Sequence, residues 1–141
     1  MSKQPRGQSR RAGKAADASP PAHAGPPQLR GRIGIDIGDR PALTEAGADL
    51  LEQIAISGSL SEAARQLRYS YRWAWLLVDG MNQAWSQPLV VTATGGKRGG
   101  GAQLTDFGRN VLSAYRHLQL ELEHFLDQQH EPFARAIKAV S

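Results

Sequence analysis

The sequence predicts a mostly α-helical domain with a small β-sheet, an α+β fold. Three observations point to this class. Apolar residues recur at three- and four-residue steps in several stretches, each preceded by a Ser or Thr suited to cap a helix. Two short strand-like stretches flank a glycine cluster, the pattern of a β-hairpin. With 141 residues, the chain has room for one ordinary domain.

The first 28 residues are expected to form a disordered basic tail. They hold five of the eight prolines and show no apolar periodicity, so they bury too little surface to offset the entropy of ordering. Seven Lys or Arg precede residue 33 against one acidic residue, whereas the rest of the chain carries ten against twelve. The formal net charge of +4 therefore comes from the N-terminal region and not from the folded domain. A polyanion-binding face of the domain must be identified from the local distribution of its charges.

Composition excludes several classes of protein. The chain has no cysteine, which rules out disulfides, thiolate metal sites and a cysteine nucleophile. Ser9-Arg10-Arg11 is not followed by the apolar run of an export signal, and no stretch reaches the length of a membrane span. We therefore expect a cytoplasmic protein that does not associate with membranes.

The domain is expected to begin with a strand and an amphipathic helix. Isoleucines alternate with small or polar residues over residues 29–37, the period of a half-buried strand. Apolar residues then recur at helical spacing from about Pro41 or Thr44 to Ser57. Gly58 is expected to end this helix.

A short helix and a longer helix follow, separated by a tight turn. Ser59 and Glu62 have the spacing of a capping box at the start of a two-turn helix that ends near Leu67. Ser70 is placed to cap the second helix, which runs to about Trp85. Such a pair predicts a helix-turn-helix, whose second helix points its first turn at the major groove of DNA. Ala63 and Ala64 in the first helix would let the second helix cross closely. An ordinary helical hairpin explains the caps and these alanines alone equally well.

The stretch TGGKRGGGA, residues 94–102, lies between strand patterns over residues 88–94 and 102–104. A nucleotide-binding P-loop requires GxxxxGK followed by Ser or Thr at a helix N-terminus, whereas Lys97 is followed by Arg98 and more glycines. The flanking strands indicate a hairpin tip instead. Across the two helices and this hairpin, five cations stand against two acids, which is the local positive potential that phosphate binding requires.

Thr105 is expected to cap a long helix that ends the domain. Its apolar positions alternate in steps of four and three residues, the spacing of a coiled-coil seam: Val111, Tyr115, Leu118, Leu122 and Phe125. The apolar seam extends beyond what the core of so small a domain can cover, which predicts a homodimer with two-fold symmetry. The alternative is that the seam packs within its own chain. The expected domain covers residues 29–128. Residues 129–141 are expected to form an extension, in which Glu131-Pro132 interrupts the helix and residues 133–140 form a last short one.

Residues expected to contact DNA lie at two helix N-termini, in the turn between the helices, and at the hairpin tip. They are Ser59, Ser61, Arg68, Ser70, Tyr71, Arg72, Trp73, Thr94, Lys97 and Arg98. Arg72 can reach a guanine edge or a phosphate, and both remain open. Capping is the expected main role of Ser59. Trp75, at the border of the apolar face, is expected in the core.

Catalysis and metal binding are not expected. Glu121 and His124 form an E-x-x-H pair with His117 one turn earlier, but on a polar helix face such residues are usually solvated. No serine is flanked as in a nucleophile elbow. The alternative to a DNA-binding regulator is a non-DNA interaction module, or an oxyanion-responsive binding protein that uses the basic hairpin tip.

Four stretches together carry a family resemblance: SGSLSEAARQL, YSYRWAW, GMNQ and TATGGKRGGGAQLTDFGRNVL. They resemble the N-terminal DNA-binding domain of the ModE family of molybdate-responsive transcriptional regulators, a winged helix-turn-helix related to that of LysR-type regulators. The resemblance runs from about Leu29 to Phe125, and residues 93–108 are its most specific part.

The resemblance implies a dimer on double-stranded DNA with a palindromic operator. The implied recognition residues are Ser70, Tyr71, Arg72 and Trp73, and the implied wing contacts are Thr94, Lys97 and Arg98. Full-length members of the family continue into molybdate-binding domains, for which this chain has no room. We therefore expect no cofactor and no molybdate site.

Overall fold

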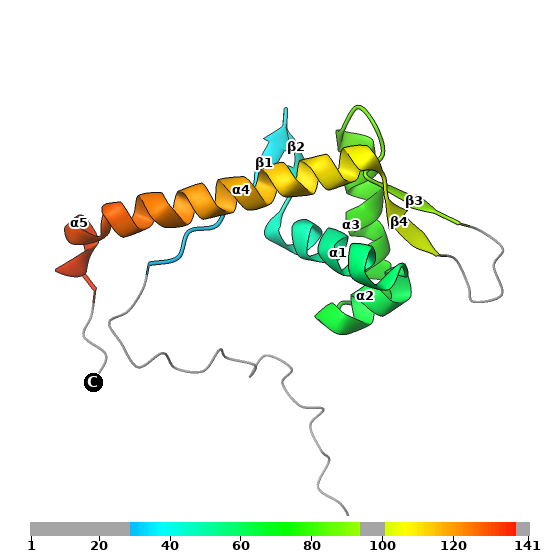
Figure 1. Cartoon of the computed structure of the whole chain (residues 1–141), viewed down its shortest axis with the longest axis horizontal. Helices are drawn as coiled ribbons and strands as arrows, with labels where there is room; N and C mark the ends of the chain where they lie inside the picture. Colours follow the sequence, from blue (N-terminus) through cyan, green and yellow to red (C-terminus); the bar gives the residue numbers. More distant parts are fainter. Residues whose placement is uncertain (1–28, 94–100, 138–141) are drawn as a thin grey trace, which may run out of the picture.

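The computed structural model describes residues 29–93 and 101–137 (Figure 1). The predictions for residues 1–28, for Thr94, Lys97 and Arg98, and for residues 138–140 lie outside this part. The described elements, in chain order, are β1 (Ile35–Ile37), β2 (Arg40–Leu43), α1 (Glu45–Ser57), α2 (Leu60–Leu67), α3 (Tyr71–Ala84), β3 (Val90–Thr92), β4 (Ala102–Leu104), α4 (Asp106–Gln128) and α5 (His130–Ala134). Helices dominate, and the antiparallel pairs β1–β2 and β3–β4 complete the predicted α+β fold.

The predicted caps Ser59, Ser70 and Thr105 begin α2, α3 and α4, and Thr44, one of the two starts considered for the first helix, caps α1. In each case a side-chain oxygen accepts a hydrogen bond from a backbone N–H in the first turn, which satisfies a donor that the helix itself leaves unpaired. The pairs are Thr44 with Gly47 at 3.0 Å, Ser59 with Glu62 at 3.2 Å, Ser70 with Trp73 at 3.0 Å, and Thr105 with Gly108 at 2.8 Å. Gly58 ends α1 in the left-handed conformation, as predicted.

The core lies where α1, α2 and α3 meet the hairpin β3–β4 and the first half of α4. Its buried side chains come from every one of these elements and include Leu50, Leu51, Ile54, Leu60, Val78, Met81, Leu89, Leu104 and Tyr115. Small residues stand where the helices cross, namely Ala63, Ala64 and Ala74, all at most 2% exposed. They let α3 pack closely on α2 and hold it at a fixed angle.

The N-terminal region differs from the prediction. The strand expected over residues 29–37 is limited to β1, and a second strand, β2, pairs with it through a turn in which Gly38 has a φ of +65°. Pro41 therefore lies in a strand, and the helix begins after Thr44. The sequence did not decide whether residues 41–43 form a strand or the first turn of the helix. Ala42 and Leu43, each 1% exposed, fit the apolar spacing of the helix as well as they fit a strand.

The helix α4 runs unbroken from Asp106 to Gln128 and extends away from the wing, so that α5 lies at the opposite end of the molecule from β3 and β4 (Figure 1). The next helix starts earlier than predicted, because Glu131 and Pro132 lie in the first turn of α5, where proline is tolerated.

Within the described residues no helix has the length and apolar character needed to cross a membrane.

Candidate nucleic-acid interface

The turn between α2 and α3 has the geometry of a helix-turn-helix. Arg68 ends α2 in the left-handed conformation with a φ of +59°, and the N–H of Tyr69 donates to the carbonyl of Ala64 at 2.9 Å. Ser70 then returns to extended backbone and caps α3. Because the hairpin β3–β4 follows α3 directly, the fold is a winged helix-turn-helix, with β3–β4 as the wing.

The first turn of α3 presents large side chains to solvent. Tyr71 is 58% exposed and Trp73 is 47% exposed, and Arg72 between them is exposed as well. The opposite face of α3 is buried through Ala74 and Val78. The predicted recognition residues therefore lie together on an accessible helix end, where unpaired backbone N–H groups favour an anion.

Trp75 corrects the prediction that placed it in the core. Its side chain is 50% exposed, because it lies beyond the edge of the face that Ala74 and Val78 bury. Tryptophan generally prefers burial, but the core at this level of α3 is already filled by alanines of α2 and α3. The Trp75 side chain therefore stays at the surface. An additional aromatic side chain therefore stands one turn beyond Tyr71.

Ser59 and Ser61 lie at the start of α2, with their hydroxyl oxygens 3.0 Å apart. Ser59 is half-buried and caps the helix, whereas Ser61 is exposed. Further along α2, Arg65 is held by Glu62 at 2.7 Å. Hydrogen bonds from Arg65 and Gln66 lower the pKa of Glu62, and the bond to Glu62 raises the pKa of Arg65, so this pair stays ionised at neutral pH.

The root of the wing is tied to the turn between α1 and α2. The N–H of Ala102 donates to the carbonyl of Gly58 at 3.0 Å, and Gly101 forms an isolated bridge with Ser59. On the other side, the N–H of Ala93 donates to the carbonyl of Gly101 at 2.7 Å. The wing root and the N-terminus of α2 are therefore neighbours on one side of the domain.

Asn82 connects α3 to the wing, and sequence reasoning missed it. Its Nδ2 donates to the carbonyl of Val90 at 2.9 Å, while its Oδ1 accepts from the N–H groups of Leu89 and Val90 at 2.8 and 3.2 Å. The only signal in the sequence was the GMNQ stretch, which carried the family resemblance without a role for Asn82. One side chain thus fixes α3 relative to the strand that leads into the wing.

The residues of the predicted dimer seam fall into two groups in the structure, those covered by their own chain and those exposed to solvent. Tyr115 is fully buried and its hydroxyl donates to the carbonyl of Ile33 at 2.8 Å, so its side chain packs within its own chain and is not available to a second copy. Val111 is half-buried against the same core. Leu122 lies against the backbone of Gly31, where an added Cβ would approach its Cδ2 to 2.6 Å. Leu118 and Phe125 remain, 44% and 57% exposed.

Among the described residues no group of three or more His, Asp or Glu side chains could hold a metal ion. His117 Nε2 lies 3.8 Å from Glu121 Oε1, and both side chains are exposed.

No protein-family model matches the chain. The chain is 41% identical over 100 residues to the molybdenum transport protein ModE of Azotobacter vinelandii, a match that covers 71% of this chain and 37% of that protein. It is 47% identical over 66 residues to the DNA-binding transcriptional dual regulator ModE of Escherichia coli (strain K12), covering 47% of this chain and 25% of that protein. The same identity and length relate it to the molybdenum-pterin-binding protein MopB of Rhodobacter capsulatus, of which 24% is covered.

The chain thus spans between about a quarter and little more than a third of the length of these relatives. By this sequence similarity the chain belongs to the ModE family.

Proposed function

We propose that the chain is a transcriptional regulator that acts in the cytoplasm by binding duplex DNA, with α3 as recognition helix and β3–β4 as the wing. The observation that carries the proposal is the exposed first turn of α3, capped by Ser70 and held to the wing by Asn82. The names of the relatives support it, because one of them is a DNA-binding transcriptional dual regulator.

In this proposal the first turn of α3 enters the major groove. Arg72 has the reach for a bidentate contact to a guanine edge or for a phosphate, and the hydroxyls of Ser70 and Tyr71 can bond to phosphate or base oxygens. Trp73 adds apolar contact area beside them. The N-terminus of α2, with Ser61, and Arg68 in the turn lie on the flanking backbone.

The wing would follow an adjacent groove or the backbone beside it. Lys97 and Arg98 belong to the nine-residue stretch between β3 and β4, and the wing root lies next to the N-terminus of α2. Cations at that location would neutralise phosphates.

A homodimer on a palindromic operator completes the proposal. Leu118 and Phe125 are two helical turns apart on α4 and exposed, which makes them the candidates for contact with a second copy. A two-fold axis through α4 would place two copies of α3 about one turn of DNA apart.

Duplex selection from random sequence, followed by titration at several salt concentrations, tests the proposal. The logarithm of affinity should fall linearly with the logarithm of salt concentration, and replacing both Lys97 and Arg98 by alanine should reduce the slope by about two. The matched control is Arg135→Ala, an exposed arginine near α5 that the proposal leaves off the DNA. Absence of duplex binding at low salt, or an equal effect of Arg135→Ala, contradicts the proposal.

Arg72→Ala separates the two roles of Arg72. A contact to a base edge predicts a loss of about 1 to 3 kcal/mol and relaxed preference at one base pair, whereas a phosphate contact predicts an equal loss on every duplex.

We also propose that duplex binding by this chain does not require molybdate, because the bonds that hold α3 and the wing root in place are internal to the chain. The same titration with and without molybdate should give one affinity. A change in affinity would show that the anion is sensed.

A further inference from the structure

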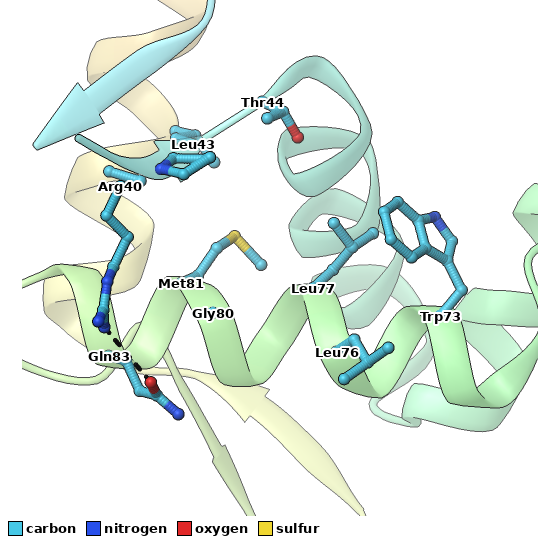
Figure 2. A pocket seen from close by; sticks show the side chains of 11 residues that line it. Arg40, Leu43, Thr44, Trp73, Leu76, Leu77, Gly80, Met81 and Gln83 are labelled. Atoms are coloured by element: carbon cyan, nitrogen blue, oxygen red, sulfur yellow. Dashed lines mark hydrogen bonds between the residues drawn. The ribbon is translucent and has the colours of Figure 1, made fainter.

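An apolar groove lies along α3, on the side that faces β2 and the start of α1. Its volume is about 330 Å³, and its apolar lining includes Leu43, Trp73, Leu76, Leu77 and Met81 (Figure 2). Trp73 and Leu76 are 47% and 43% exposed, so the groove leaves apolar surface in contact with water. This volume is at the lower end of the range for small-molecule sites.

Gly80 lines the groove in the interior of α3, and its own chain gives no packing reason for a glycine there. A Cβ added at Gly80 would meet nothing within 4 Å, whereas one added at Gly47 would lie 3.0 Å from Met81 Sδ. A glycine inside a helix lowers stability relative to alanine. The missing side chain therefore costs stability and keeps the groove open.

The two ends of the groove differ in chemistry. Arg40 and Gln83 lie at one end and Trp73 at the other (Figure 2). Gln83 Nε2 is held by Asp79 at 2.8 Å, and Arg40 reaches Gln83 Oε1 through one long hydrogen bond of 3.4 Å. Within the described part of the chain, this is the single hydrogen bond of the Arg40 guanidinium, which leaves other N–H groups for an anion.

We propose that this groove binds a small amphipathic monocarboxylate, with its carboxylate at Arg40 and its aromatic or branched body along Leu77 toward Trp73. Apolar walls with one cation at the end select this chemistry, because an uncharged apolar molecule leaves the guanidinium unused and a dianion leaves one charge without a partner. The size of the groove favours a compact ligand over a folded partner.

Ligand binding in the groove would also affect duplex binding by α3, because Trp73 belongs to the first turn of this helix. A ligand that holds the Trp73 side chain in the groove would change duplex affinity, and duplex would change ligand affinity by the same factor. This consequence rests on the proposed function, whereas the binding of the carboxylate does not.

The test uses the full chain without DNA, with 2-naphthoate as the probe. Titration followed by nuclear magnetic resonance should give a dissociation constant on the order of 0.1 to 1 mM and shift the indole N–H of Trp73. Gly80→Leu fills the groove and should weaken binding at least about 10-fold while the thermal midpoint does not fall, since leucine favours a helix. Ala55→Leu, which adds the same side chain at an exposed position of α1, is the control and should bind as the parent does.

Charge is tested separately. Arg40→Gln should weaken 2-naphthoate about 10-fold and leave the uncharged 2-naphthalenemethanol unchanged. Equal affinity of the two probes, unchanged binding in Gly80→Leu, no saturation below about 10 mM, or shifts outside the groove would each overturn the proposal. So would a change of oligomeric state in Gly80→Leu, because that identifies a second copy as the occupant.

Discussion

At the scale of single residues, two helical glycines have opposite surroundings. Gly108, in the first turn of α4, lies so close to the start of β3 that an added Cβ would be 2.9 Å from the carbonyl carbon of Leu89, which is backbone and cannot yield. Gly80 in α3 has open space instead. The same substitution therefore has opposite consequences at the two sites.

We expect Gly108→Ala to destabilise the protein by about 3 kcal/mol, because α4 must move away from β3. Gly80→Ala should stabilise it by up to about 1 kcal/mol through helix propensity alone. Urea unfolding of the two variants measures both effects. Similar values for the two variants would contradict the close approach of α4 to Leu89.

Tyr115 makes stability depend on pH at the alkaline end. Burial, followed by the charge of Glu45, raises the pKa of Tyr115 above its ordinary value of 10.0. The folded state thus holds the phenolic proton more tightly than the unfolded state. The stabilisation is complete below about pH 10 and is lost as the pH rises through the raised pKa.

Tyr115→Phe should therefore lower stability at neutral pH by about 1 kcal/mol, through loss of the bond to Ile33, and flatten the decline above about pH 10. Burial also raises the pKa of Tyr69, so part of the decline should remain. Unfolding measured from pH 7 to 11 checks this, with Tyr71→Phe at an exposed tyrosine as the control. An unchanged decline in Tyr115→Phe would contradict the assignment.

At the scale of elements, the starts of α2, α3 and α4 were predictable because they depend on local chemistry. Ser59, Ser70 and Thr105 each satisfy a backbone donor three residues along the chain, so the signal and its effect lie in the same short stretch. The pairing of β2 with β1 was not predictable in this way. Strand pairing depends on a partner, and residues 41–43 fit a helical period as well as a strand.

Three hydrogen bonds of the Asn82 side chain join α3 to residues seven and eight positions along the chain, at the start of the wing, and they give a prediction. Asn82→Ala removes three hydrogen bonds and should cost about 2 to 3 kcal/mol, because the N–H groups of Leu89 and Val90 lose their acceptor. It should also reduce duplex affinity by freeing the angle between α3 and the wing.

Gln83→Ala, one residue along and exposed, is the matched control and should change stability by less than about 0.5 kcal/mol. Denaturant unfolding and duplex titration give the two readouts. If Asn82→Ala behaves like Gln83→Ala in both, the positioning role of Asn82 is wrong.

At the scale of the whole molecule, the seam on α4 shows what periodicity leaves open. Its spacing correctly marked one apolar face, but a face can be covered by the same chain or by another copy. Tyr115 is covered by the domain core and Leu122 by the segment at Gly31, whereas Leu118 and Phe125 stay exposed. The burial of each position depends on the path of residues 29–34, which helical spacing on α4 does not encode.

The exposed part of the seam predicts the effect of charge on assembly. Replacing Leu118 and Phe125 together by glutamate should convert a dimer to a monomer at micromolar concentration, because two carboxylates per copy would be buried in the interface. Leu120→Glu is the control, since Leu120 is 57% exposed but lies on another side of α4. Sedimentation distinguishes the species, and a parent chain that sediments as a monomer contradicts the dimer itself.

A dimer also makes affinity depend on the spacing of the two half-sites. Inserting about five base pairs between them turns one half-site to the opposite face of the duplex and should reduce binding strongly, while about ten should restore part of it. Gel-shift titration of the three duplexes measures this. Equal affinities would show that each copy binds alone.

Because α4 is long and unbroken, a small change of its tilt at one end displaces its other end by several ångströms. At 23 residues the helix is about 34 Å long, and its first turn is seated on Leu89, at the root of the wing. A tilt of about 5° at that seat would move the far end by about 3 Å, a distance close to the rise of one base pair. In the proposed dimer, with α4 making the contact between copies, the separation of the two α3 helices would then depend on packing at Gly108, a site that need not touch the DNA.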